Sequence, residues 1–227
     1  MSFQRIAAIA GLVTFVLGAA AGFFPMSGEY PTPQSSGPEF AVFYATNRNS
    51  VIAVQLLSAA VFITLVLFAA GLYLALRPAE RERGEGWSIV GLLGAVAASV
   101  IYTIGSALTI GLALSAGLIK SDAAALMPLG VANAALGSIG GLQIAMFAGG
   151  FAIAQWRTSV APRWLASLGL AAAAASLIAA VGTFTGGTLA TASFLLGTVA
   201  LLLWVLAISV RVLRAPAPAH RVVVPAG

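Results

Sequence analysis

The chain has 227 residues, of which 60% are hydrophobic and 7% charged; its mean hydropathy is +1.03 and its formal net charge is +5. A water-soluble domain carries about 25% charged residues, so this composition excludes an ordinary soluble fold and indicates a membrane protein. The chain contains no cysteine, which excludes disulfides, iron–sulfur clusters and thiolate zinc sites.

Long apolar runs without charged residues occupy most of the chain. The hydrocarbon core of a bilayer is about 30 Å thick, so a helix needs about 20 mostly apolar residues to cross it. We therefore predict an all-α, polytopic transmembrane helix bundle, with its six spans in a single domain over residues 1–214. The predicted spans are 6–24, 51–76, 87–115, 129–155, 164–185 and 189–210.

The first run also has features of a secretory signal peptide. Arg5 precedes an apolar stretch that ends in the small residues 18–21. The run continues through Phe23 and Phe24, which favours a helix that is retained in the mature protein. Cleavage is the alternative, and it would leave five helices and an external N-terminus.

The two connections that follow have different compositions. Residues 25–50 contain several prolines together with Glu29, Glu39 and Arg48, which predicts an irregular extramembrane loop. Its two carboxylates could act as an acid/base pair, although no second motif anchors them. Residues 77–86 alternate in charge, which is typical of a solvated turn.

The basic residues predict the orientation, because Lys and Arg are retained on the cytoplasmic side of a membrane. If the N-terminus is inside, nine arginines face the cytoplasm and two basic residues face outward, so we predict that both termini are cytoplasmic. Trp87, Trp156 and Trp164 fall at predicted inner ends, and indole rings prefer the headgroup level. The inner residues are Arg5, Arg77, Arg81, Arg83, Arg157, Arg163, Arg211, Arg214 and Arg221; the outer ones are Arg48 and Lys120.

The predicted cytoplasmic tail covers residues 215–227. Its basic residue and those just before it can contact anionic headgroups, and a docking motif for a protein partner is the alternative. Because the basic residues flank apolar runs, we expect membrane lipids as partners and no nucleic acid.

Small residues mark the predicted packing faces, because lipid provides no hydrophobic drive for helix association. We expect these faces to pack inside the bundle, and a homodimer interface is the alternative. Three glycine pairs are spaced by four residues: Gly18 and Gly22, Gly137 and Gly141, and Gly182 and Gly186.

Two sets of polar side chains lie within the predicted spans. At about 1.5 Å per residue, the first set shares one depth and predicts a structural stripe bonded between helices. The second set lies about 12–14 Å from the span midpoints toward the outer face and could line an outward-facing pocket; bonding to neighbouring helices is the alternative. The first set is Tyr102, Thr103 and Gln143, and the second is Gln55, Thr109 and Asn133.

Several chemistries are excluded by the residues that the spans lack. No Asp, Glu, Lys, Arg or His lies within a predicted span, which argues against a proton-driven pump. His220 in the tail is the only histidine, so haem ligation by two histidines and a serine–histidine dyad are excluded within the bilayer. The chain also lacks the glycine-rich phosphate loop of ATPases. We therefore predict no catalytic residue, no cofactor and no metal site.

Three short motifs carry a resemblance to a known family. They are Arg5 with Ala8, Gly11 and Leu12, then Asn47-Arg48-Asn49, and finally Pro162-Arg163-Trp164-Leu165 before Gly169. In these motifs the chain resembles a bacterial family of six-helix membrane proteins classed as a domain of unknown function, numbered four-three-eight-six. The resemblance implies a multi-pass position in the bacterial cytoplasmic membrane, and it implies no activity.

Three functional classes remain. Helix packing through small residues, together with uncharged spans, favours a non-enzymatic membrane scaffold or accessory protein. The sequence is compatible with a protein partner but does not identify one. A carrier or binder of a small lipophilic or neutral molecule would need the pocket at Gln55, Thr109 and Asn133 to be open. An intramembrane enzyme would need the outer carboxylates to converge.

Overall fold

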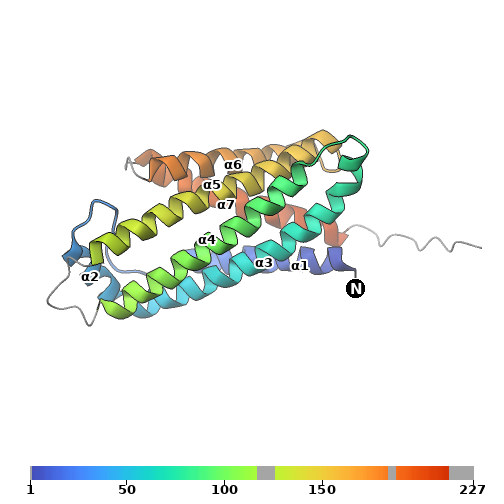
Figure 1. Cartoon of the computed structure of the whole chain (residues 1–227). Helices are drawn as coiled ribbons and strands as arrows, with labels where there is room; N and C mark the ends of the chain where they lie inside the picture. Colours follow the sequence, from blue (N-terminus) through green and yellow to red (C-terminus); the bar gives the residue numbers. More distant parts are fainter. Residues whose placement is uncertain (1, 117–125, 184–187, 215–227) are drawn as a thin grey trace, which may run out of the picture.

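The computed structural model describes residues 2–116, 126–183 and 188–214 (Figure 1). These residues form helices and no strands. The helices are α1 (Phe3–Gly22), α2 (Gly37–Thr46), α3 (Arg48–Arg81), α4 (Trp87–Ser115), α5 (Leu126–Thr158), α6 (Arg163–Gly182) and α7 (Thr188–Arg214). The predicted tail, Lys120 and Asp122 lie outside the described residues.

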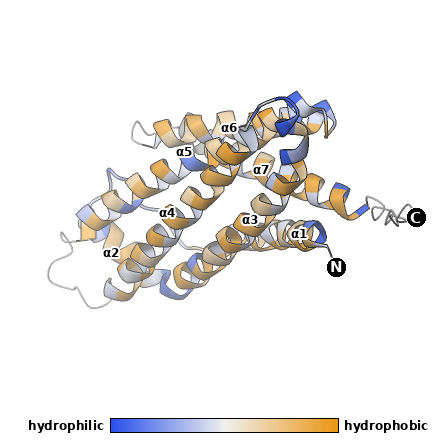
Figure 2. Ribbon diagram, turned by 45° about the vertical axis from the view of Figure 1, so that its right-hand side comes forward, coloured by the Kyte–Doolittle hydropathy of each residue, from blue (hydrophilic) through white to orange (hydrophobic). Residues whose placement is uncertain are grey.

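Six of the helices, all except α2, contain a stretch long and apolar enough to cross a membrane. Even the shortest, α1 and α6, have 20 residues each, which is about 30 Å of helix. Hydrophobic residues cover the middle of the helices and hydrophilic residues gather mainly at their ends (Figure 2). Large apolar side chains point outward, among them Leu56, Ile63 and Leu196, each at least 60% exposed. The all-α, six-span prediction is confirmed, and the chain is a multi-pass membrane protein.

Each predicted span overlaps one helix, and the span 87–115 coincides with α4. The largest difference is at α3, which extends beyond the predicted 51–76 at both ends. Its added residues include Arg77, Glu80 and Arg81, which are good helix formers although they cannot enter the hydrocarbon core. The apolar run therefore defines the membrane-crossing part of α3 and not the ends of the helix.

The prediction of an irregular loop over 25–50 is wrong for its second half, where α2 and the start of α3 lie. Ser36 precedes α2, and the Glu39 carboxylate accepts hydrogen bonds from the Ser36 N–H at 2.6 Å and the Ser36 hydroxyl at 3.0 Å. Pro38 lies in the first turn, where a missing N–H removes no helical hydrogen bond. Here the proline begins a helix instead of interrupting one.

The six long helices form a closed ring in chain order. Each packs against the next, and α7 returns to pack against α1. Neighbours are antiparallel: along α4 and α5, for example, Gly91 adjoins Gly150 while Gly105 adjoins Asn133. The starts of α1, α4 and α6 and the ends of α3, α5 and α7 therefore lie together. We call this the basic end and the other the α2 end. The basic end carries Arg5, Arg77, Arg81, Arg83, Arg157, Arg163, Arg211 and Arg214.

Aromatic rings fill the centre of the ring in the half nearer the basic end. Phe147 lies edge-on to both Phe151 and Trp204, with ring centroids 5.6 Å apart in each pair. Phe68 lies edge-on to Trp204 at 6.4 Å. All four side chains are at most 2% exposed. Side chains from α3, α5 and α7 thus join the helices across the ring.

Glycines bring the backbones of α4 and α5 into close contact. A Cβ atom at Gly150 would lie 2.5 Å from the backbone nitrogen of Gly91, and one at Gly94 would lie 2.5 Å from that of Phe147. One member of each of two predicted glycine pairs packs inside the bundle: a Cβ atom at Gly18 would lie 2.9 Å from Leu202 of α7, and one at Gly141 would lie 3.1 Å from Ala180 of α6. Gly186 of the third pair lies outside the described residues. Gly22 and Gly137 have no atom within 4 Å of an added Cβ.

Candidate functional site

The structure brings two of the three predicted pocket residues to one place. The Thr109 hydroxyl donates to the carbonyl oxygen of Gly105 at 2.8 Å, and a Cβ at Gly105 would lie 3.5 Å from Oδ1 of Asn133. Thr109 is buried, whereas Asn133 is half-buried. Thr109 and Asn133 therefore both lie near Gly105, where α4 packs against α5.

Gln55, the third predicted pocket residue, lies on α3 at the same level. The rings of Phe62 and Tyr102 stack with centroids 4.4 Å apart, which fixes the register of the antiparallel helices α3 and α4. Gln55 precedes Phe62 by the same number of residues as Thr109 follows Tyr102, so the two lie at one depth. Gln55 is half-buried.

Two of the three predicted stripe residues, Tyr102 and Thr103, bond to backbone carbonyl oxygens. Tyr102 donates to the carbonyl oxygen of Gly137 at 3.5 Å, and the Thr103 hydroxyl, which is exposed, donates to Ser99 within α4 at 2.7 Å. The carbonyl oxygen of Gln143 adjoins Gly94, so Gln143 lies nearer the basic end than Tyr102 does. Counting residues from the midpoints of the predicted spans placed Tyr102 and Gln143 at one depth. Such counting does not give the register of α4 against α5.

A compact cap covers the α2 end. The buried side chain of Asn47 accepts a hydrogen bond from the Ser27 N–H at 2.7 Å and donates to the carbonyl oxygens of Ser27 and Phe43. Tyr44 is 1% exposed, and its hydroxyl lies 3.3 Å from that of Tyr30. We call Ser27, Tyr30, Phe43, Tyr44 and Asn47 the α2 cap. Burial raises the pKa of the Tyr44 hydroxyl, which therefore stays protonated.

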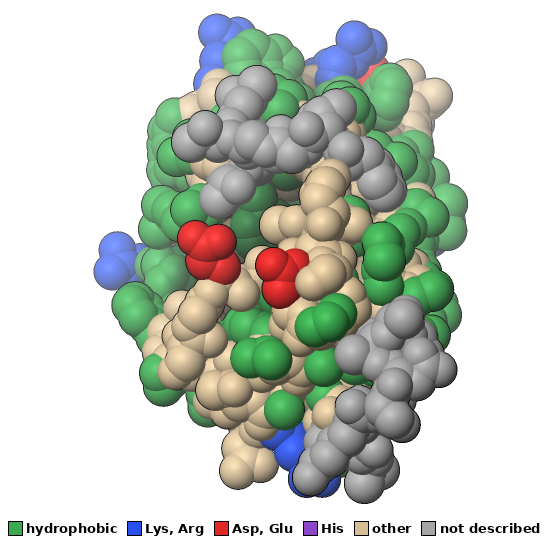
Figure 3. Space-filling view, turned by 90° about the vertical axis from the view of Figure 1, so that its left-hand side faces the viewer, with side chains coloured by type: hydrophobic (Ala, Val, Ile, Leu, Met, Phe, Trp, Pro, Cys, Tyr) green, Lys and Arg blue, Asp and Glu red, His purple; other side chains and the backbone are tan. Residues whose placement is uncertain are grey.

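Glu39, one of the two carboxylates predicted as an acid/base pair, does not show the environment of a general acid. Figure 3 shows acidic side chains on a face of mostly hydrophobic and neutral atoms. The backbone N–H and hydroxyl of Ser36 hold the pKa of Glu39 below its usual range. A general acid needs a raised pKa, so Glu39 is better explained as the cap of α2.

At the basic end, two carboxylates connect helices. Glu80 is 2% exposed, and its carboxylate accepts hydrogen bonds from the Ser88 N–H at 2.9 Å and from the Ser88 hydroxyl. It thereby joins the end of α3 to the start of α4. Glu85 forms an ion pair with Arg157 of α5 at 2.6 Å, and this hydrogen-bonded guanidinium lowers the pKa of Glu85. These acids hold the turn between α3 and α4 in place.

A groove of about 660 Å³ lies between α6 and α7 at the basic end. Its size falls within the range of about 300–1,000 Å³ that is usual for ligand sites. From the sequence we predicted its arginines as topology markers that can contact anionic headgroups, but nothing in the sequence pairs them with α6. The lining residues are Trp164, Leu165, Ala207, Val210, Arg211 and Arg214.

The sequence also did not single out the polar atoms that are buried without a partner. Within the described residues, no hydrogen bond reaches Oε1 of Gln155, Nε1 of Trp204 or the hydroxyls of Ser138 and Ser209. Over the same residues, no group of three or more His, Cys, Asp or Glu side chains could hold a metal ion.

Comparisons of the chain with models of protein families, with curated proteins and with solved structures find no match in any of the three.

Proposed function

We propose that the protein is a non-enzymatic membrane scaffold or accessory protein of the bacterial cytoplasmic membrane. The observation that carries this proposal is the aromatic centre of the ring. Phe68, Phe147, Phe151 and Trp204 fill the space between the helices in the half nearer the basic end. A centre packed in this way supports a structural role better than a path for a transported molecule.

The proposal is tested by what the protein carries when it is purified. The full chain is extracted from its own membrane into lipid nanodiscs, and bound proteins and small molecules are identified by mass spectrometry. A scaffold or accessory protein should retain a protein partner at a fixed ratio after cross-linking. A small molecule other than a phospholipid, retained at a fixed ratio with no protein partner, would overturn the proposal.

The proposed orientation places the basic end, and so both termini, in the cytoplasm. It is supported by the gathering of arginines at that end, whereas Arg48 is the one basic residue described at the α2 end. Reporters fused after Arg83, Trp156 or Arg214 should behave as cytoplasmic, and reporters fused near Gln34 or Asp122 as external. A cytoplasmic signal from the fusion near Gln34 would reverse this orientation.

The second candidate function is the binding of a small lipophilic or neutral molecule at the α2 end. It is favoured by the positions of Thr109 and Asn133, which both lie near Gly105. For a ligand-binding role, Asn133→Leu should remove a co-purifying molecule and leave the melting temperature nearly unchanged. Thr103→Val is the control, because that exposed hydroxyl bonds within its own helix. Loss of melting temperature without loss of a ligand would assign Asn133 to helix packing.

A further inference from the structure

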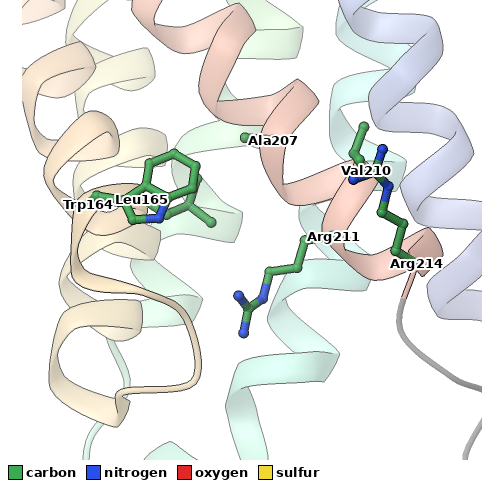
Figure 4. A pocket seen from close by; sticks show the side chains of 6 residues that line it. All are labelled: Trp164, Leu165, Ala207, Val210, Arg211 and Arg214. Carbon is green, nitrogen blue, oxygen red and sulfur yellow. The ribbon is translucent and has the colours of Figure 1, made fainter.

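The groove between α6 and α7 combines apolar walls with two cationic side chains. Helix α7 provides Ala207, Val210, Arg211 and Arg214, whose spacing of three or four residues places them on one face (Figure 4). Helix α6 provides the buried Leu165 and the exposed ring of Trp164, which is 61% exposed. The groove is open to the surface of the bundle.

Most hydrogen-bond donors of the two arginines are available to a ligand. One nitrogen of Arg211 donates to the carbonyl oxygen of Val160 at 3.4 Å, which connects α7 to the turn before α6. A guanidinium has five N–H donors, so this bond leaves most of them unused. In the part of the chain that the structure describes, neither Arg211 nor Arg214 forms an ion pair.

The helix dipole explains only part of this arrangement. Basic residues in the last turn of α7 are favoured by the partial negative charge at the end of that helix. That effect acts on any basic residue in the turn and does not require the side chain to line a groove. Figure 4 shows the Arg211 side chain extending from α7 toward the α6 side, whereas the Arg214 side chain extends on the other side of α7, by Val210. Arg211 is therefore the arginine that is directed at the α6 wall of the groove, and Arg214 adds a second positive charge at its α7 wall.

The position of the groove matches the two parts of a phospholipid. Its arginines lie in the last turns of a membrane-crossing helix, at the level where headgroups are found, together with the amphipathic ring of Trp164. Its apolar walls, Leu165, Ala207 and Val210, belong to the adjoining parts of the two spans. Guanidinium groups pair with phosphate through two parallel hydrogen bonds, which an ammonium group does not form.

We propose that this groove binds one anionic phospholipid, with the phosphate held by Arg211 and Arg214 and an acyl chain along the apolar walls. Basic pockets between membrane-spanning helices are a known form of anionic lipid site. The lipid site is independent of the proposed scaffold role.

The test uses the full chain in nanodiscs that contain phosphatidylglycerol and phosphatidylcholine with the same acyl chains. After transfer to mild detergent, native mass spectrometry counts the lipids that remain bound. The wild-type protein should retain phosphatidylglycerol in preference to phosphatidylcholine. Replacing both arginines (R211Q with R214Q) should lower this retention at least about tenfold, because two charge-assisted contacts are lost.

The matched control removes the same charge from the same end but outside the groove. R81Q with R83Q should change the retention less than about twofold, because these exposed charges are screened. If both double variants lost the same amount of bound phosphatidylglycerol, the lipid would be held by the overall positive charge of the basic end. That result would overturn the proposal. Displacement of the lipid by excess inorganic phosphate would also overturn it, since it would indicate a site for the free anion.

A second variant tests the apolar part of the site and keeps the charges. Val210→Phe narrows the groove, so it should lower the retention of phosphatidylglycerol although Arg211 and Arg214 remain. This variant also decides the question if the double arginine variant does not fold. Full retention in Val210→Phe, at an unchanged melting temperature, would contradict binding in the groove.

Discussion

Replacing Gly150 by alanine tests the close contact between α4 and α5. The new methyl group would lie 2.5 Å from the backbone nitrogen of Gly91 and 2.9 Å from the carbonyl oxygen of Trp87, whereas ordinary contacts begin at 3.4 Å. These are backbone atoms, so the helices must separate by about 1 Å. Overpacking typically costs about 1–3 kcal/mol. The better helix propensity of alanine offsets at most about 1 kcal/mol.

We therefore expect Gly150→Ala to lower the free energy of unfolding by about 1–2 kcal/mol. The matched control is Gly137→Ala in the same helix, where no atom lies within 4 Å of the added Cβ. This control should be neutral or slightly stabilising. Thermal melts in detergent, followed by tryptophan fluorescence, compare the two variants. A Gly150→Ala protein that melts with the wild type, or a Gly137→Ala protein that is equally destabilised, would refute the reasoning.

Asn47→Ala should loosen the α2 cap, because three buried or partly buried hydrogen bonds are lost, at roughly 1 kcal/mol each. Hydrogen exchange over residues 26–36 should become faster, whereas Asn49→Ala, at an exposed position, should leave it unchanged. The ion pair of Glu85 with Arg157 should make stability depend on pH. A lowered folded-state pKa means that the stabilisation is complete above the unfolded value of about 4.3 and is lost as the pH falls through the folded value. Melts of Glu85→Gln across this range should lack that part of the acid dependence, and an unchanged dependence would assign it to other groups.

The membrane-crossing helices could be predicted because an uncharged run of about 20 residues has one physical outcome in lipid. The helix α2 could have been predicted as well. Ser36, followed three residues later by Glu39, with Pro38 between them, is a start signal for a helix. Weighing the prolines of 25–50 as helix breakers concealed it.

The contacts between helices could not be predicted from the sequence, because they depend on which helix faces pack together. Gly137 was predicted as a packing residue because it lies four residues from another glycine, yet no atom lies within 4 Å of a Cβ added there. Gly150, which the spacing did not single out, packs directly against the backbone of α4. The same holds for the candidate sites. The depths of Thr109 and Asn133 followed from counting residues, but their positions near Gly105 required the register of α4 against α5. The groove likewise required α6 beside α7, which brings Trp164 next to Arg211.

The order of helices around the ring has a consequence for biosynthesis. Most neighbours in the ring also follow one another in the chain, with α2 between α1 and α3, so their contacts can form during translation. The exception is α1, whose second partner is α7: Gly11 adjoins Ser209, and Gly18 adjoins Leu202. That face of α1 has to remain in contact with lipid until the last helix is inserted. Synthesis of α7 and closure of the ring are therefore one event, and a chain truncated before α7 would leave the seam between α1 and α6 open.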